Sequence, residues 1–152
     1  LEFRRVLFRS MKYFDPDISK KYSNAPDYFE KATSALEEMV RQQPIRIFDE
    51  NGIMQRGVIV RHLVLPGQTE DSMRILEYLA KTYNNGVIKS IMNQFTPLDT
   101  LLNYPELKRK LREKEYQNVV DYAWSIGTEN SFIQEGETAK ESFIPSFDDE
   151  GV

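Results

Sequence analysis

The positions of the apolar residues predict three helices. Such residues recur every three or four positions in 26–43, 69–83 and 112–126, which is the spacing of one helix face. In the first helix Pro26 suits the opening turn, Ser23 or Asn24 is the expected cap, and Pro44 is the stop. The second helix is expected to end at Asn84-Asn85-Gly86 and the third at Gly127.

Three runs of β-branched and aliphatic residues, at 57–65, 87–94 and 131–135, predict strands. Long apolar runs are typical of strands covered on both faces, as in a parallel sheet. The dipeptide Asn51-Gly52 predicts a tight hairpin before the first of them. Strands that alternate with helices indicate an α/β fold with parallel, adjacent strands and the helices on its outer face. Three such strands make a poor free-standing domain, so the pattern predicts part of a larger barrel, with an irregular tail.

The first ten residues, LEFRRVLFRS, do not follow this pattern. Their apolar run is too short for a secretory signal, whereas a mitochondrial presequence fits their Arg and Ser content better. All ten are also encoded in frame by CTG GAG TTC AGA CGT GTG CTC TTC CGA TCT, which resembles a short-read sequencing adapter. The last interpretation is preferred. It predicts that residues 1–10 are not native and make few packed contacts, that Met11 need not be a start, and that 11–152 is a C-terminal fragment.

Composition narrows the class of protein. The chain has 152 residues, 40% of them hydrophobic and 29% charged, which is ordinary for one globular domain. Its net charge is −4, although the first ten residues carry three Arg and one Glu. The acidic balance argues against nucleic-acid binding, and no apolar stretch approaches the roughly 20 residues of a membrane span. We expect a cytoplasmic protein. The absence of cysteine excludes disulfides and thiolate metal sites in this chain.

Polar residues at the carboxyl ends of the predicted strands are the candidate site. Working residues of parallel α/β folds lie at these ends. Arg61 interrupts an aliphatic strand, so it binds either a ligand or a structural ion-pair partner. Asn93 and Gln94 interrupt the next strand, either as ligand contacts or as satisfied core amides. His62 points away from Arg61 and is expected to be neutral under a helix. The charged clusters at 108–110 and 113–115 are expected to be solvated, and Gln134 and Glu135 are weaker candidates.

Several segments resemble one enzyme family. KYFDPDISKKYSNAPDYFEKA, GVIVRHLVLPGQTEDS, MNQFTPL, YPELKRKL and NSFIQEGETAKESFIPSFD are similar, in the same order, to the C-terminal half of radical S-adenosylmethionine proteins related to pyruvate formate-lyase activating enzymes. The resemblance covers residues 11–152. It implies an α/β fold that is the C-terminal part of a partial (β/α)6, TIM-like barrel. It also implies a [4Fe-4S] cluster that reduces S-adenosylmethionine to a 5′-deoxyadenosyl radical, which abstracts hydrogen from a substrate.

The resemblance assigns roles to four residues. Lys12 matches the Lys of an Asp-x-Lys pattern near the cofactor's methionine carboxylate, but the Asp position holds Ser10. Arg61 matches an Arg that reaches the same cofactor, and Asn93 and Gln94 match the adenosyl side. The CxxxCxxC motif is absent because the chain has no cysteine, and thiolates hold such clusters.

The expected function is therefore that of a fragment. The parent is expected to be a radical S-adenosylmethionine enzyme whose partner is a glycyl-radical enzyme or another protein substrate, and the cluster belongs to the parent alone. The fragment itself is expected to be inactive. Two alternatives remain: a stand-alone α/β protein-interaction module without catalysis, and an unrelated barrel enzyme in which Arg61 binds an anionic substrate.

Overall fold

The structure, a computed structural model, describes residues 5–84, 86–97, 104–127, 131–135 and 140–144, and of the last two segments only the backbone. The helices are α1 (Pro16–Ser23), α2 (Tyr28–Gln42), α3 (Thr69–Tyr83) and α4 (Glu113–Ser125), with a 3-10 turn, η1 (Pro105–Lys108). The strands are β1 (Arg5–Ser10), β2 (Ile47–Phe48), β3 (Met54–Leu63), β4 (Ile88–Met92), β5 (Ser131–Glu135) and β6 (Lys140–Ile144).

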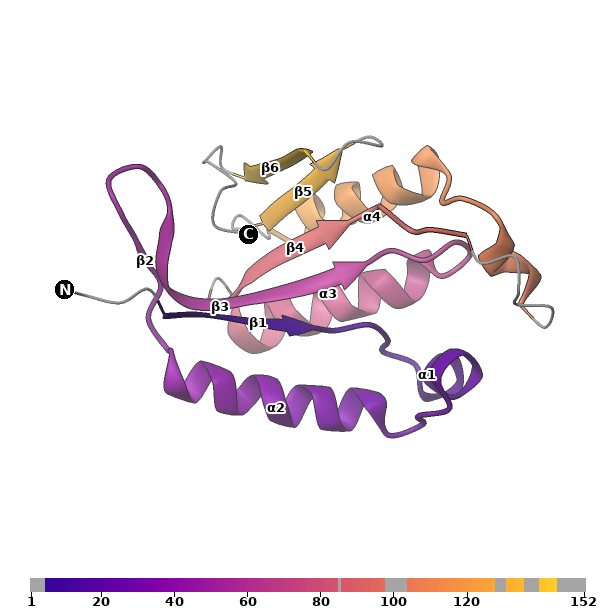
Figure 1. Ribbon diagram of the computed structural model, residues 1–152, viewed down its shortest axis with the longest axis horizontal. Helices are drawn as coiled ribbons and strands as arrows, with labels where there is room; N and C mark the ends of the chain where they lie inside the picture. Colours follow the sequence, from indigo (N-terminus) through magenta and orange to yellow (C-terminus); the bar gives the residue numbers. More distant parts are fainter. Residues whose placement is uncertain (1–4, 85, 98–103, 128–130, 136–139, 145–152) are drawn as a thin grey trace.

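The strands form one mixed sheet in the order β1-β3-β4-β5-β6, and β2 pairs with β3 (Figure 1). β1, β3, β4 and β5 are parallel, whereas β2 and β6 run antiparallel to their neighbours. The fold is therefore α/β, and the prediction that the three apolar runs lie parallel and adjacent is confirmed. The predicted hairpin is confirmed too. Gly52 takes a φ of 79°, and the Asp49 carboxylate accepts hydrogen bonds from Asn51 and Ile53.

The prediction that residues 1–10 make few packed contacts is wrong for the described part. Arg5–Ser10 forms β1, which pairs with β3 along its whole length, from Arg5 beside Arg56 to Ser10 beside Arg61. Leu7 packs into the core beneath the helices, and Val6 packs on the opposite face. Ladder hydrogen bonds join backbone groups, so a short apolar segment fills a strand position whatever its origin. The pairing therefore leaves the adapter interpretation untested.

The predicted irregular tail is also wrong in part. Residues 140–144 form β6, which pairs antiparallel with β5 from Ser131 beside Ile144 to Glu135 beside Lys140. The sequence KESFI has only a weak alternation of polar and apolar residues. Its strand state depends on the partner strand, which short-range patterning does not reveal. Residues 145–152 lie outside the described part of the chain.

Helices α2, α3 and α4 pack on one face of the sheet; in Figure 1, α3 and α4 pass behind the strands and α2 lies below β1. Alternate residues of β3 and the loop after it, Val58, Val60 and Val64, pack beneath them in two core clusters. The residues between them face the opposite way, where Ile59 packs with Ile88 and Met54. The prediction of helices on one outer face holds, and the other face of the sheet is free of helices in the part of the chain that the structure describes.

The three predicted helices match their ranges to within two residues, but the predicted cap of α2 is wrong. Asn24 does not cap it. Instead Asn24 ends a helix not predicted from the sequence, α1, with a left-handed φ of 51°. Asp27 occupies the N-cap of α2 without a side-chain hydrogen bond. The Asp15 side chain caps α1 by accepting from the Asp17 N–H. Within the described residues, no helix is both long and apolar enough to cross a membrane.

Candidate functional site

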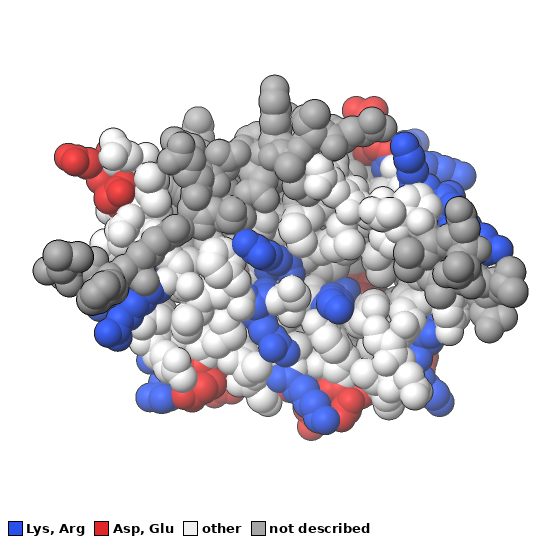
Figure 2. All heavy atoms as spheres, in the orientation of Figure 1, with Lys and Arg blue, Asp and Glu red and all other residues white. Residues whose placement is uncertain are grey.

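Arg61 lies on the helix-free face, near the carboxyl end of β3. It is half-buried, and its guanidinium carbon lies 4.3 Å from the centre of the Phe8 ring on β1. No carboxylate forms an ion pair with it in the described ranges. The structural alternative for Arg61, a buried ion pair, therefore finds no support there. Figure 2 shows this face, with Lys and Arg side chains across its middle and most Asp and Glu side chains near its margins.

Lys12, Asn93 and Gln94 lie just beyond the ends of neighbouring strands. Lys12 follows β1 and is exposed; its backbone N–H donates to the Tyr28 hydroxyl at 3.0 Å. Asn93 and Gln94 follow β4, where Gln94 is exposed and the Asn93 Oδ1 is buried without a hydrogen-bond partner among the described residues. All four predicted site residues therefore lie at or just beyond the carboxyl ends of β1, β3 and β4. That they contact a single ligand stays a prediction.

His62 is neutral and packed under a helix, as predicted. It is 3% exposed, with Nδ1 2.7 Å from the Met11 carbonyl oxygen and Nε2 2.7 Å from the Ser72 Oγ. A carbonyl only accepts, so Nδ1–H donates to Met11 and Nε2 accepts from Ser72. Burial lowers the pKa of His62 to about 4. The ring joins the end of β1 to β3 and α3, which is a structural role.

Asp71 holds the chain that leaves β1. Its carboxylate accepts from the backbone N–H groups of Phe14 at 3.0 Å and Asp15 at 2.8 Å. Burial raises the pKa of Asp71, although these two hydrogen bonds act in the opposite direction. Since Asp71 lies in the first turn of α3, it fixes the segment that contains Lys12 relative to that helix.

Two buried polar residues on β4 were not singled out from the sequence. Lys89 is on the helix side, where its Nζ donates to the Asn84 carbonyl at 2.7 Å at the end of α3. Burial lowers the pKa of Lys89 to about 8. Ser90 pairs in register with Arg61, and its hydroxyl has no hydrogen-bond partner in the part of the chain that the structure describes. The only sequence signal for either was a polar residue inside the apolar run VIKSIM.

The loops after the parallel strands are joined by two glutamates. Glu106, in η1, binds the Lys21 ammonium at 2.7 Å and accepts from the Tyr22 hydroxyl, both of α1. These contacts hold the pKa of Glu106 down at about 2. They connect the loop region after β4 to the helix after β1. The ring of Tyr104 packs edge-on against Tyr22 beside this contact.

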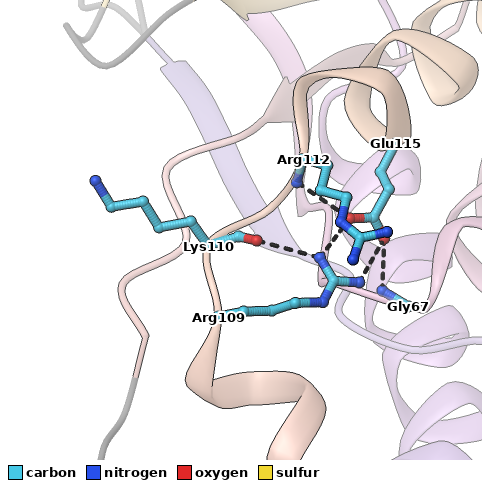
Figure 3. Close-up of polar contacts among 5 residues, drawn as sticks. All are labelled: Gly67, Arg109, Lys110, Arg112 and Glu115. Carbon is cyan, nitrogen blue, oxygen red and sulfur yellow. Dashed lines mark hydrogen bonds and ion pairs between the residues drawn. The ribbon is translucent and has the colours of Figure 1, made fainter.

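The second glutamate is Glu115. Its contacts show that the prediction of merely solvated clusters at 108–110 and 113–115 is wrong for Arg109 and Glu115. Glu115 pairs with both terminal nitrogens of Arg109, at 2.6 and 3.1 Å, and accepts from the Gly67 N–H at 2.7 Å (Figure 3). It also accepts from the Arg112 N–H at 3.0 Å at the start of α4. One carboxylate thus fixes the loop after β3 to the segment before α4. Sequence spacing did not indicate it, because Gly67 is distant along the chain.

Glu115→Gln is expected to destabilise the fold by about 2 kcal/mol at neutral pH, because charge-assisted bonds become neutral ones. Arg109, above all, holds the pKa of Glu115 near 2, against an ordinary 4.5. The stability that the ionised Glu115 contributes is thus present above pH 4.5 and is lost as the pH falls toward 2. Urea unfolding should show the gap between wild type and variant closing over that window. Glu113→Gln, exposed in the same first turn, should show no such gap.

Elsewhere on the described surface there is a shallow groove and no group of side chains suited to hold a metal ion. The groove, of about 320 Å³, lies between α3 and α4, lined by Glu77, Ala80, Lys81, Tyr122 and Ile126. It is on the helix layer, away from Arg61. Across the residues that the structure describes, no three His, Asp or Glu side chains are grouped so as to hold a metal ion. Gln134 and Glu135 belong to β5, whose side chains lie outside the description.

Comparisons with known proteins give one distant relative. The chain is 24% identical over 119 residues to an uncharacterised protein of Methanocaldococcus jannaschii, a match that covers 78% of this chain. The chain thus spans only about a third of the relative's length, 31%. No family model matches the chain, and no solved structure does.

Proposed function

We propose that the chain is part of a radical S-adenosylmethionine enzyme similar to pyruvate formate-lyase activating enzymes. On this proposal the sheet is a segment of a partial (β/α)6, TIM-like barrel, with the helix-free face turned inward. Its support is the arrangement of β3, β4 and β5, parallel neighbours with helices on one face. Parallel sheets occur almost only where both faces are covered, and closure into a barrel covers the second face.

The iron–sulfur cluster does not fit this chain. Its ligands are thiolates, and the chain has no cysteine. The chain therefore supplies no step that passes through the cluster, and the cluster belongs to the parent protein in this proposal. When bound to a reduced cluster, S-adenosylmethionine supplies a 5′-deoxyadenosyl radical that abstracts a hydrogen atom, in activating enzymes from a glycine of a partner protein.

S-adenosylmethionine itself fits the side chains at the carboxyl edge. Arg61 and Lys12 are cations suited to the methionine carboxylate, and Arg61 has no ion-pair partner in the described ranges. The unpaired Oδ1 of Asn93 would accept a hydrogen bond from the adenine amino group, with Gln94 beside it. The single observation that carries the proposal is the position of Arg61: a cation on the helix-free face of parallel strands, beside Ser90 of β4 and without an ion-pair partner in the described ranges.

The gene upstream of Met11 provides a direct test. An independent assembly of the same locus should replace the codons for residues 1–10 with a continued reading frame, and that frame should encode CxxxCxxC roughly a hundred residues upstream of Met11. A stop codon and a ribosome-binding site immediately before Met11 would instead support a stand-alone interaction module. A complete barrel that lacks the three cysteines would support an unrelated enzyme with an anionic substrate.

Activity measurements test the assignment of Arg61. The 152-residue chain should bind no iron on anaerobic reconstitution and form no 5′-deoxyadenosine with dithionite, whereas the full-length protein should do both. In the full-length protein, Arg61→Ala should weaken S-adenosylmethionine binding by about tenfold or more with iron content unchanged. Arg56→Ala, at the amino end of the same strand, is the matched control and should bind normally. Cofactor cleavage by the short chain would contradict the proposal.

A further inference from the structure

Ser90 is buried in a way that ordinary packing does not explain. It is 1% exposed, and its Oγ makes no hydrogen bond. Buried hydroxyl groups are nearly always paired, because loss of water without a replacement partner costs free energy. Ile88 and Ile91 of β4, and Val87 just before the strand, belong to apolar clusters. An alanine at this position would pack equally well and would bury no unpaired oxygen. Packing alone therefore does not account for the hydroxyl group.

The pairing register places Ser90 beside Arg61. Paired residues of parallel strands project to the same face, and the pairs Ser10–Arg61 and Arg61–Ser90 form one row across β1, β3 and β4. The row below it is apolar: Phe8, Ile59 and Ile88. Among the described residues, a cation with no carboxylate partner and a hydroxyl with no hydrogen-bond partner therefore lie side by side above an apolar layer.

We infer that Ser90 is a further ligand-binding residue of this face, whose Oγ–H donates to one oxygen of a carboxylate while Arg61 binds the other. The inference rests on the proposed function, in which Arg61 faces the carboxylate of S-adenosylmethionine, and it names a contact beyond the four residues assigned above. A carboxylate has two oxygens, so one can accept from the Ser90 hydroxyl while the other binds the Arg61 guanidinium.

Ser72 provides a matched control. It is also 1% exposed, but its Oγ lies 2.7 Å from His62 Nε2 and so has a structural partner. Removing a paired buried hydroxyl destabilises a fold, whereas removing an unpaired one is neutral or stabilising. Ser72→Ala should therefore lower the urea midpoint and leave ligand affinity unchanged. Ser90→Ala should instead lower ligand affinity and leave the urea midpoint unchanged or raised.

The experiment titrates the full chain and three variants, Ser90→Ala, Ser72→Ala and Arg61→Ala, followed by NMR shifts. The probes are acetate, S-adenosylmethionine and its decarboxylated analogue, which lacks the carboxylate. Ser90→Ala should weaken binding of the first two by about tenfold or more and leave the decarboxylated analogue unaffected. Its unfolding midpoint in urea should equal or exceed that of the wild type.

The outcomes separate this inference from the proposed function. Binding of acetate through Arg61 and Ser90, without binding of S-adenosylmethionine, would keep the carboxylate site and reject the proposed function. Binding of S-adenosylmethionine that depends on Arg61 and not on Ser90 would reject the inference alone. The inference is also overturned if Ser90→Ala loses stability as Ser72→Ala does, or if the wild-type chain binds neither carboxylate probe.

Discussion

Deleting residues 1–10 is expected to destabilise the fold by at least about 3 kcal/mol, a large part of the 5–15 kcal/mol that holds a typical domain folded. The loss has two sources. Val6 and Leu7 leave the two faces of the sheet, which exposes apolar side chains that pack against them. β3 also loses one of its parallel partners over the six pairs from Arg5–Arg56 to Ser10–Arg61. Urea unfolding followed by circular dichroism measures the change, and a newly exposed strand edge is also expected to promote aggregation.

Two variants test whether this position needs any strand or needs this particular sequence. The Met11 N–H donates to the Arg61 carbonyl at 2.8 Å, so by alternation the Leu7 N–H also points at β3. Leu7→Pro should therefore reproduce much of the loss. The exchange Val6→Ile with Leu7→Val keeps an apolar strand and should retain stability. That result would agree with a strand position that accepts a non-native segment. Unchanged stability after deletion of 1–10 would show that β1 contributes nothing.

The sequence predicted the parts of the fold that depend on local pattern. Helices α3 and α4 have apolar residues every three or four positions, and strands β3 and β4 are apolar runs. Clear stop signals such as Asn84 end these elements. The opposite orientations of Arg61 and His62 follow from the two-residue period of a strand, and both are observed. These features depend on neighbours in the chain, so one sequence suffices to predict them.

The parts that were missed depend on partners far along the chain. β1 and β6 are strands because β3 and β5 pair with them, and their own patterns are weak. Glu115 lies in a charged cluster typical of a solvated face, yet its carboxylate binds Gly67, which is remote in sequence. Ser90 could be noticed only as one polar residue in an apolar run. Its significance comes from its register with Arg61 and from its unpaired hydroxyl, which are properties of the sheet.

His62→Asn is expected to destabilise the fold by about 3 kcal/mol at neutral pH. The smaller side chain leaves a cavity, and it cannot meet both the Met11 carbonyl and the Ser72 hydroxyl, which would leave a buried polar group unpaired. The link between the end of β1, β3 and α3 is lost at the same point. Thermal or urea unfolding at pH 7 should show the loss, and His62→Gln, which is longer, should restore part of it.

The same residue makes stability depend on pH in a direction that can be worked out. Burial lowers the pKa of His62 to about 4 from its ordinary 6.5, so the unfolded chain takes up a proton before the folded chain does. The stabilisation from neutral His62 is thus complete above pH 6.5 and is lost as the pH falls through 4. Over that window the loss is about 3 kcal/mol, since one pKa unit corresponds to about 1.4 kcal/mol. Buried carboxylates such as Asp71 titrate in both wild type and His62→Asn, so the difference between the two isolates the histidine. That difference should shrink from pH 7 to pH 4. A constant difference across this range would show that His62 is not kept neutral by burial.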